Sequence, residues 1–242
     1  MSVIVNADDF GISEEVNNAI KLAFERGLIQ RTTLMVNMPY AKEAMEMARE
    51  CGFADSVGIH LNLTAGVPLY EPMKKDSVMC DSEGKYTANF ARNLKTRFFL
   101  SQTTTENIRN ELNMQLKKYR ELGGTLWHID SHHHVHTNPS VWGPLKKVMG
   151  DYSISSIRLG RNMYKGGNPL MHLYKRFLNS SITKHCKHSS DYFGSYADYE
   201  SWTQGMSESE LSDFVSKYDV EIMVHPMFSK EGVLMDSERV FE

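Results

Sequence analysis

Short apolar runs alternate along the chain with longer segments in which apolar residues recur at helical spacing. A run of roughly four to eight mostly apolar residues has the length of a buried strand. Such runs predict seven strands, at residues 2–6, 32–37, 56–63, 125–130, 156–159, 191–195 and 220–225.

The segments between these runs predict helices at about residues 13–27, 40–51 and 105–122. Ser13 is expected to cap the first of them and Gly27 to follow its end. Two further helix starts are indicated by Asn138 before Pro139, and by Ser207 with a glutamate three residues later, which forms a capping box.

This order of elements predicts an α/β fold with a mostly parallel sheet covered on both faces. Composition does not change abruptly, so we expect a single domain over residues 1–242. About seven strand–helix units favour an irregular or incompletely closed (β/α) barrel, and an open doubly wound sheet is the main alternative. The polar stretches near 65–90 and 160–190 are too long for ordinary connections. They are expected to be lids over a cleft or oligomer contacts.

Composition excludes several functional classes. A net charge of -3 gives no support for binding nucleic acid or an anionic membrane, and no apolar run is long enough to span a bilayer. The start, MSVIVNADDF, lacks the features of a signal peptide. The three cysteines, Cys51, Cys80 and Cys186, lack CxxC spacing and are expected to be free thiols in a cytoplasmic protein. A homodimer is expected, because it is the commonest assembly and the long polar stretches could supply contacts.

Candidate chemistry is concentrated in HIDSHHHVH, residues 128–136. This segment holds five of the ten histidines and an aspartate within nine positions. Histidine is the commonest metal-ligating side chain. Alternate residues of a strand share a face, so His128, Asp130 and His132 should point the same way. The segment indicates a metal or catalytic site, and a solvated histidine-rich loop is the alternative.

Other polar residues end the predicted strands. In a parallel barrel, functional groups come from the carboxyl ends of the strands, and these ends carry Asn6, Asp8, Asp9, His60, Asn62, His128, Asp130, His132 and His225. Each has an ordinary structural explanation, such as a turn or a buried hydrogen bond, but together they predict a shared site. One carboxylate and two imidazoles would leave positions open on a divalent cation for water and substrate. A second aspartate could accept the proton of water, and a histidine opposite could protonate the leaving group.

Five segments of the chain resemble the YdjC-like carbohydrate deacetylases: VNADDFG (5–11), RTTLMVN (31–37), VGIHLNLTAGVPL (57–69), HIDSHHHVH (128–136) and VHP (224–226). The resemblance implies an irregular (β/α) barrel related to the NodB-type polysaccharide deacetylases. It also implies a metal-dependent hydrolase that removes acetyl groups from N-acetylated mono- or oligosaccharides of the chitooligosaccharide kind.

By this resemblance, Asp9, His60 and His132 are the metal ligands, Asp8 is the catalytic base and His225 is the acid that serves the leaving amine. The assignment of Asp8 as the base and Asp9 as the ligand, and not the reverse, rests on analogy with the related deacetylases. Met227 stands where the family commonly has glycine or alanine, and it is expected to narrow that wall of the pocket.

The identity of the metal depends on which argument is followed. The resemblance implies one magnesium ion per chain, whereas two imidazole ligands suit zinc or another transition metal better. Two other functions fit the sequence. One is a metal-dependent hydrolase of a different amide or ester, and the other is a non-enzymatic metal-handling protein that binds several ions through the histidine cluster.

Overall fold

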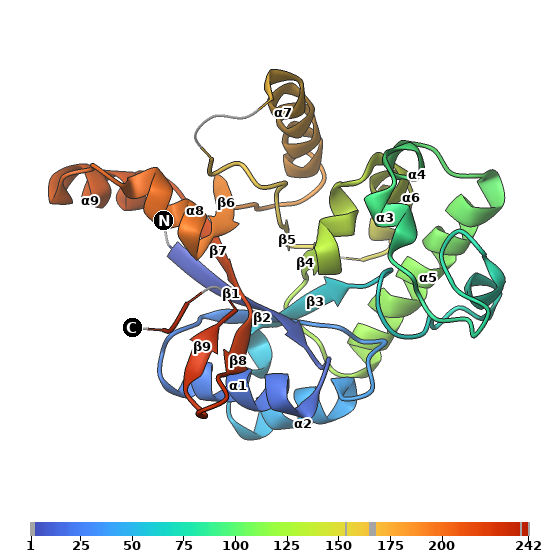
Figure 1. Cartoon of the computed structure of the whole chain (residues 1–242), viewed down its shortest axis with the longest axis horizontal. Coiled ribbons are helices and arrows are strands. Elements are labelled where there is room, and N and C mark those ends of the chain that lie inside the picture. Colours follow the sequence, from blue (N-terminus) through green and yellow to red (C-terminus); the bar gives the residue numbers. More distant parts are fainter. Residues whose placement is uncertain (1–2, 153, 165–167, 238, 242) are drawn as a thin grey trace.

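The computed structural model describes residues 3–152, 154–164, 168–237 and 239–241. Its centre is a seven-stranded parallel sheet in the order β5-β4-β3-β2-β1-β7-β6 (Figure 1). The strands are β1 Val3–Phe10, β2 Arg31–Leu34, β3 Val57–Leu61, β4 His128–Ser131, β5 Ser156–Ile157, β6 Tyr192–Ser195 and β7 Val220–Val224. Ser2, the first residue of the first predicted strand, lies outside the described residues.

All seven predicted strands are confirmed, and so is the irregular barrel. Each strand pairs in parallel with its neighbours. Within the described part of the chain, the edge strands β5 and β6 do not pair with each other, so the curled sheet is a half-barrel. The carboxyl ends of strands distant in sequence therefore face one another across its mouth.

All five predicted helices are also confirmed. They are α1 Glu14–Glu25, α2 Ala41–Glu50, α5 Gln102–Glu121, α6 Pro139–Met149 and α9 Glu208–Lys217. The hydroxyl of Ser13 accepts a hydrogen bond from the backbone of Val16 at the start of α1, and Ser207 and Glu210 form the predicted capping box at α9. The short 3₁₀ segments are η1 Ala54–Ser56, η2 Glu71–Lys75 and η3 His132–Thr137.

Several elements were not predicted. They are the helices α3 Asn89–Arg92, α4 Leu94–Phe98, α7 Pro169–Thr183 and α8 Tyr196–Thr203, and the antiparallel strands β8 Pro226–Phe228 and β9 Leu234–Asp236. Residues 160–190, which were expected to form a lid or an oligomer contact, contain the unpredicted helix α7. This helix buries Leu178 and Ile182 but exposes Leu170, Leu173 and Phe177, so its apolar residues do not follow one core-facing stripe.

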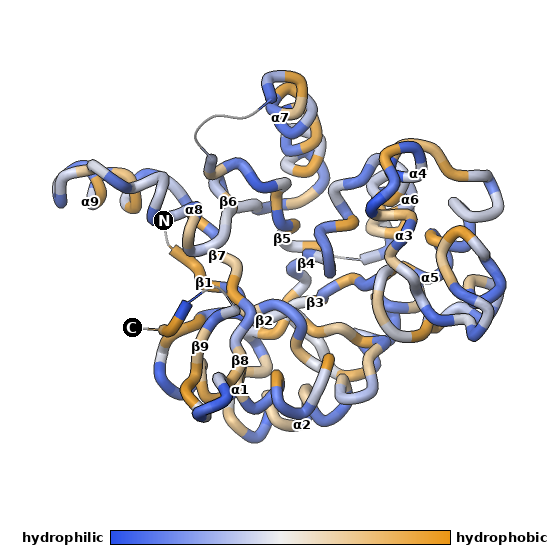
Figure 2. The backbone as a smooth tube through the Cα atoms, in the orientation of Figure 1, coloured by the Kyte–Doolittle hydropathy of each residue, from blue (hydrophilic) through white to orange (hydrophobic). Residues whose placement is uncertain are grey.

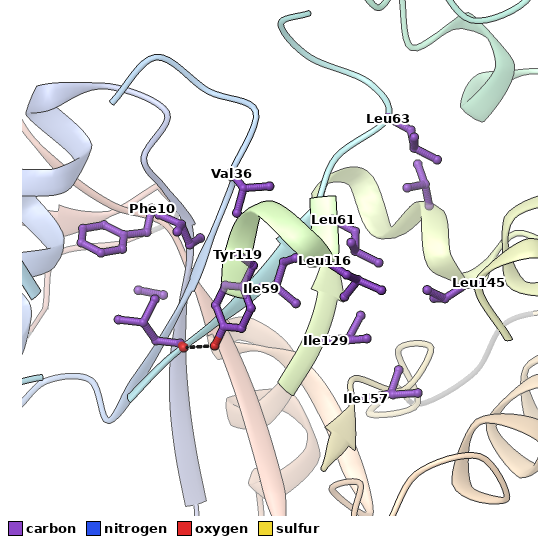
Figure 3. Close-up of a cluster of buried hydrophobic side chains, with 14 of the residues drawn as sticks. Phe10, Val36, Ile59, Leu61, Leu63, Leu116, Tyr119, Ile129, Leu145 and Ile157 are labelled. Atoms are coloured by element: carbon purple, nitrogen blue, oxygen red, sulfur yellow. Dashed lines mark hydrogen bonds between the residues drawn. The ribbon is translucent and has the colours of Figure 1, made fainter. Parts of the chain in front are cut away.

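The two faces of the sheet differ in polarity, and this difference positions the site. On the outer face, Ile59 and Leu61 of β3 pack with Leu116 and Tyr119 of α5 (Figure 3). The Tyr119 hydroxyl lies 2.7 Å from the carbonyl oxygen of Val57. The inner face carries buried polar side chains from six different strands or their ends, among them Asn6, Thr33, His60, Asp130, Arg158 and Glu221. The interior of the half-barrel is therefore polar.

No helix in the described ranges is long and apolar enough to cross a membrane. The three cysteines are free, as predicted.

Candidate metal site

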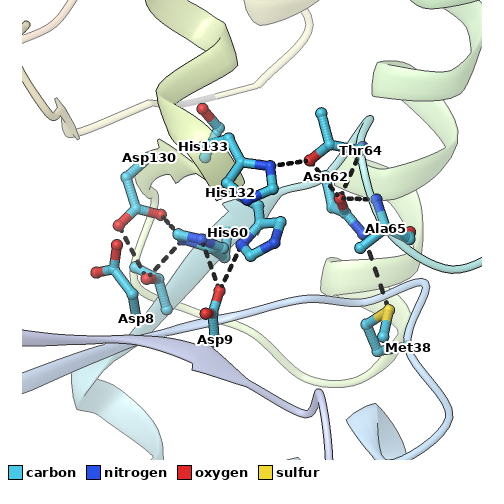
Figure 4. A network of polar contacts seen from close by, with 12 residues as sticks. Asp8, Asp9, Met38, His60, Asn62, Thr64, Ala65, Asp130, His132 and His133 are labelled. Atoms are coloured by element: carbon cyan, nitrogen blue, oxygen red, sulfur yellow. Dashed lines mark hydrogen bonds and ion pairs between the residues drawn. The ribbon is translucent and has the colours of Figure 1, made fainter. Parts of the chain in front are cut away.

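The backbone at the end of β1 brings two adjacent aspartates to the same side. The pairing of β1 with β2 shifts register between Ala7 and Phe10, and Asp9 has a φ of 67°. A bulge of this kind re-aims side chains, and a positive φ is strained for a residue other than glycine. In a regular strand Asp8 and Asp9 would point to opposite faces; here both are directed toward the mouth of the half-barrel (Figure 4).

Asp9 meets two histidines from other strand ends. Its Oδ1 lies 3.2 Å from Nε2 of His60 and 2.8 Å from Nδ1 of His132. The three ligand atoms all lie within 4.8 Å of one another. The structure thus brings together the three residues that the sequence analysis selected as metal ligands.

His60 is held in place from behind by a carboxylate. Its Nδ1 lies 2.7 Å from Oδ1 of Asp130, and Thr33 donates a hydrogen bond of 2.9 Å to the other oxygen of Asp130. A carboxylate can only accept, so Nδ1 carries a proton and Nε2 is directed toward Asp9. A carboxylate behind a histidine is the usual support of a metal-ligating imidazole.

The charges around Asp9, His60 and His132 favour the binding of a cation. Burial lowers the pKa of His60, but the carboxylates of Asp130 and Asp8 outweigh it and raise that pKa to about 10. Burial raises the pKa of Asp9, but hydrogen bonds from His132 and His60 outweigh it and hold that pKa well below its usual range. The site therefore attracts positive charge.

Asp8 lies in a different environment. Arg158 grips its carboxylate with two hydrogen bonds, Nη1 to Oδ2 at 2.6 Å and Nη2 to Oδ1 at 2.7 Å, and Asn6 donates a third to Oδ1 at 2.8 Å. Burial raises the pKa of Asp8, but the charge of Arg158 outweighs it and keeps the carboxylate ionised. Each carboxylate oxygen can accept about two hydrogen bonds, so Oδ1 is saturated while Oδ2 can accept one more.

Arg158 also binds two further carboxylates. Its Nη2 lies 2.8 Å from Oδ2 of Asp130, and its Nε lies 2.6 Å from Oε1 of Glu221. Arg31 pairs with the other oxygen of Glu221 at 2.9 Å. The interior therefore holds four carboxylates, those of Asp8, Asp9, Asp130 and Glu221, and two guanidinium groups, which pair with all of them except Asp9. A metal-ligating imidazole is neutral, so with His60 as a ligand two negative charges are left over. This is the charge that one divalent cation would neutralise, so the residues fit the metal that the resemblance implies.

Among the residues that the structure describes, two other groups of acidic and histidine side chains could geometrically hold an ion, and both overlap this network. They are Asp8 with His60 and Asp130, and His128 with Asp130 and Glu221. The guanidinium of Arg158 already occupies oxygens of Asp8, Asp130 and Glu221. The guanidinium of Arg158 does not occupy the group formed by Asp9, His60 and His132, and this group is partly open to solvent.

Four other histidines around the site lie in three different environments. His225 follows β7, is half-buried, and lies near enough to Asp8 for its charge to lower the pKa of that carboxyl. His133 and His134 have left-handed backbone conformations, with φ of 52° and 53°. His136 is fully buried, and its ring bonds to Ser131 and to the backbone of Arg158.

Sequence reasoning missed Arg158 and Glu221. The available signal was an isolated charge inside an apolar run, in SIRL for Arg158 and in VEIMV for Glu221. A charged residue is almost never fully buried unless it is paired, so each of these charges could have indicated a partner in the interior.

Replacing Arg158 by methionine is expected to lower the free energy of unfolding by about 3–5 kcal/mol, because three buried carboxylates lose their counter-charge. In a chain of this size each kcal/mol shifts the melting temperature by roughly 2–4 °C. Thermal denaturation should therefore show a fall of about 10 °C. Arg26→Met at an exposed position after α1 is the matched control, and an equal effect of the two substitutions would contradict this role of Arg158.

Comparison with known proteins agrees with this geometry. A family model described as "YdjC-like protein" matches residues 2–240. The chain belongs to the YdjC-like family. Among its curated relatives, a carbohydrate deacetylase of Clostridium beijerinckii is 30% identical over 241 residues, which is 100% of this chain and 87% of the relative. A carbohydrate deacetylase of Brevibacillus brevis is 32% identical over 237 residues, covering 98% of this chain and 86% of the relative.

A solved structure resembles this YdjC-like chain over most of its length. It is a putative cellobiose-phosphate cleavage protein from Enterococcus faecalis V583, with a TM-score of 0.66 and 26% identity, covering 96% of this chain and 83% of that one. The family confirms the resemblance found in the sequence, and its named relatives are enzymes that remove acetyl groups from carbohydrates.

Proposed function

We propose that this protein is a metal-dependent hydrolase that removes acetyl groups from N-acetylated mono- or oligosaccharides of the chitooligosaccharide kind. The observation that carries the proposal is the carboxylate of Asp9 facing the imidazoles of His60 and His132, with a second carboxylate, Asp8, beside it. Membership of a family with carbohydrate deacetylases supports the substrate class.

Asp9, His60 and His132 would hold one divalent ion per chain. When bound, the ion would supply positive charge that polarises the acetyl carbonyl and acidifies water. Magnesium follows from the family resemblance, and zinc or another transition metal from the two imidazole ligands.

The protein's own groups would carry the protons. Oδ2 of Asp8 is the carboxylate oxygen with an unused lone pair, so it would accept the proton of the attacking water. Arg158 lowers the basicity of this carboxylate, so its contribution would come from position more than from proton affinity. His225 would protonate the nitrogen as the bond between carbon and nitrogen breaks, and acetate and a free amine would leave.

The alternative of a metal-handling protein has less support. It requires several histidines of the segment 128–136 to bind metal together, but their ring nitrogens have different partners. His132 faces Asp9, His133 lies 3.1 Å from the hydroxyl of Thr64, and the ring of His136 is bonded on both nitrogens. A hydrolase of another amide or an ester would use the same groups, and substrate assays separate it from a deacetylase.

His225→Ala is expected to reduce acetate release from an N-acetylated sugar more than cleavage of an activated acetyl ester. An amine leaves only when it is protonated, whereas the leaving group of an activated ester does not need the proton. General acid catalysis contributes roughly 10²–10⁴-fold, so the amide should lose about that factor and the ester much less. Steady-state kinetics on both substrates measures the difference, and equal losses would contradict the role of His225.

We also propose that the protein is a homodimer that associates through α7. Leu170, Leu173 and Phe177 lie at helical spacing, and they are 77%, 64% and 76% exposed. Figure 2 shows that hydrophobic and hydrophilic positions alternate along α7. The ring of Phe98, 5.8 Å from that of Tyr174, links this face to the exposed Phe99. Large aromatic side chains present ~150–250 Å² each, so the face is on the order of the ~800 Å² that each partner buries in a standard interface.

Light scattering should report two chains for the native protein and one for Phe177→Glu. A native monomer would contradict the proposal.

A further inference from the structure

The backbone of His225 is held by the strand β9 and the residue after it. The N–H of His225 donates a hydrogen bond to Oδ1 of Asp236 at 2.5 Å, and its carbonyl oxygen accepts one from the backbone N–H of Ser237 at 3.1 Å. His225 comes directly after Val224, the last residue of β7. The pairing of the parallel sheet therefore ends before this residue, and the two hydrogen bonds take over the control of its position.

The residue after His225 prepares it for these two contacts. A proline disfavours the helical conformation of the residue before it and favours an extended one, so Pro226 biases His225 toward an extended backbone. In an antiparallel pair, an extended residue can present its N–H and its carbonyl oxygen to the same neighbour. Both groups of His225 meet β9 or the residue that follows it.

Asp236 is buried to an extent that is unusual for a carboxylate. It is 1% exposed and lies on β9 opposite Pro226 of β8. A charged side chain is almost never fully buried unless it is paired, and one of its partners is the N–H of His225. A hydrogen bond to an ionised acceptor is roughly twice as strong as one between neutral groups. This contact therefore restrains His225 more firmly than an ordinary backbone hydrogen bond would.

The hairpin that carries Asp236 is itself anchored to the rest of the molecule. Strands β8 and β9 lie beside α1 (Figure 1), and Leu234 of β9 is buried in the core. Arg239, which follows β9, pairs with Glu200 of α8, and its guanidinium lies 5.1 Å from the ring centroid of Tyr196. Because the hairpin is fixed on two sides, the carboxylate of Asp236 is a fixed point of attachment.

We propose that Asp236 is a positioning residue for His225, and that its Oδ1 holds the backbone N–H of His225 so that the imidazole stays at the nitrogen of the scissile bond. This inference rests on the proposed function, because that function assigns the role of the acid to His225. Asp236 transfers no proton and contacts no reacting atom. It acts through geometry alone, and a misplacement of a catalytic group by about 1 Å can cost on the order of 10²-fold in rate.

The test measures kcat on an N-acetylated sugar and on an activated acetyl ester for the metal-loaded protein. Asp236→Ala should lower kcat for the amide by about 10- to 100-fold and kcat for the ester much less, with the metal content unchanged. Asp236→Asn keeps an oxygen acceptor for the N–H of His225, so it should restore the native ratio of amide to ester. A merely structural loss would lower both rates together. Asp213→Ala, at an exposed acidic position of α9, is the matched control.

Hydrogen exchange of the His225 amide tests the contact without relying on activity. In native protein labelled with ¹⁵N-histidine, this amide should exchange slowly, because a buried hydrogen bond opens only when the hairpin opens. It should exchange faster in Asp236→Ala. An amide that exchanges in the native protein like an unprotected one would overturn the proposal, even if Asp236→Ala does not fold.

Failure of the positioning role and failure of the deacetylase proposal give different results. If Asp236→Ala folds and cleaves amide and ester in the native ratio, or if Asp236→Asn loses as much of the amide rate as Asp236→Ala, the positioning role is wrong and the deacetylase stands. If the native protein releases no acetate from any sugar, the proposed function fails. Protection of the His225 amide that is lost in Asp236→Ala then still supports the placement of His225 by Asp236, and an unprotected amide overturns it.

Discussion

Replacing His132 by alanine is expected to abolish stoichiometric metal binding and acetate release together. His60→Ala should do the same. Each substitution removes one of only three protein ligands, and the negative charges of the interior then remain without the cation that neutralises them. The loss of turnover should exceed the roughly 10²–10⁴-fold that a general base contributes, because the whole hydrolytic centre is lost.

Elemental analysis after dialysis measures this effect directly. His132 is partly exposed, so its variant should fold, whereas His60 is buried in the core and its variant needs a check of folding. His188→Ala removes an exposed histidine away from the cluster and is the matched control. Unchanged metal content in both site variants would show that Asp9, His60 and His132 are not the ligands.

Asp8→Asn is expected to retain the metal while turnover falls by roughly two to four decades, the usual worth of a general base. The amide keeps the shape of the carboxylate but cannot take a proton from water. It also weakens the double hydrogen bond to Arg158, so its melting temperature should be measured alongside. Acetate release with saturating metal gives the turnover.

Asp9→Asn is the matched comparison, since it changes the neighbouring carboxylate in the same way. It should lose the metal, because its Oδ1 is the atom that faces both histidines. If Asp8→Asn strips the metal and Asp9→Asn retains it, the two roles are exchanged. If neither substitution changes acetate release, the proposed mechanism is wrong.

The strands could be predicted from sequence because each is a short apolar run, and the candidate ligands because they follow those runs. Asp9, His60 and His132 are far apart in the chain, but the rule that parallel strands end at the same edge groups them with the other strand-end residues. The resemblance to the family then selects these three as ligands. The histidine-rich segment 128–136 was the strongest indication of a metal site in the sequence, although His132 is the one residue of that segment that faces Asp9.

The network behind the site could not be predicted in the same way. Arg158 and Asp8 are 150 residues apart, and β5 and β1 are not neighbours in the sheet. Only the curl of the half-barrel brings them together, and local sequence does not encode that curl. Helix α7 was missed because its apolar residues are mostly on the surface. The single domain, the lid role of residues 65–90 and the cytoplasmic location stay predictions from the sequence.

The central claim is that this half-barrel removes acetyl groups with the help of a bound metal. The most direct measurement is acetate release from N-acetylglucosamine oligomers by protein stripped with a chelator and then reloaded with magnesium, zinc or another divalent ion. We expect no release from the stripped protein and restored release at one ion per chain. Release that chelation does not affect, or no release with any metal, would contradict the account.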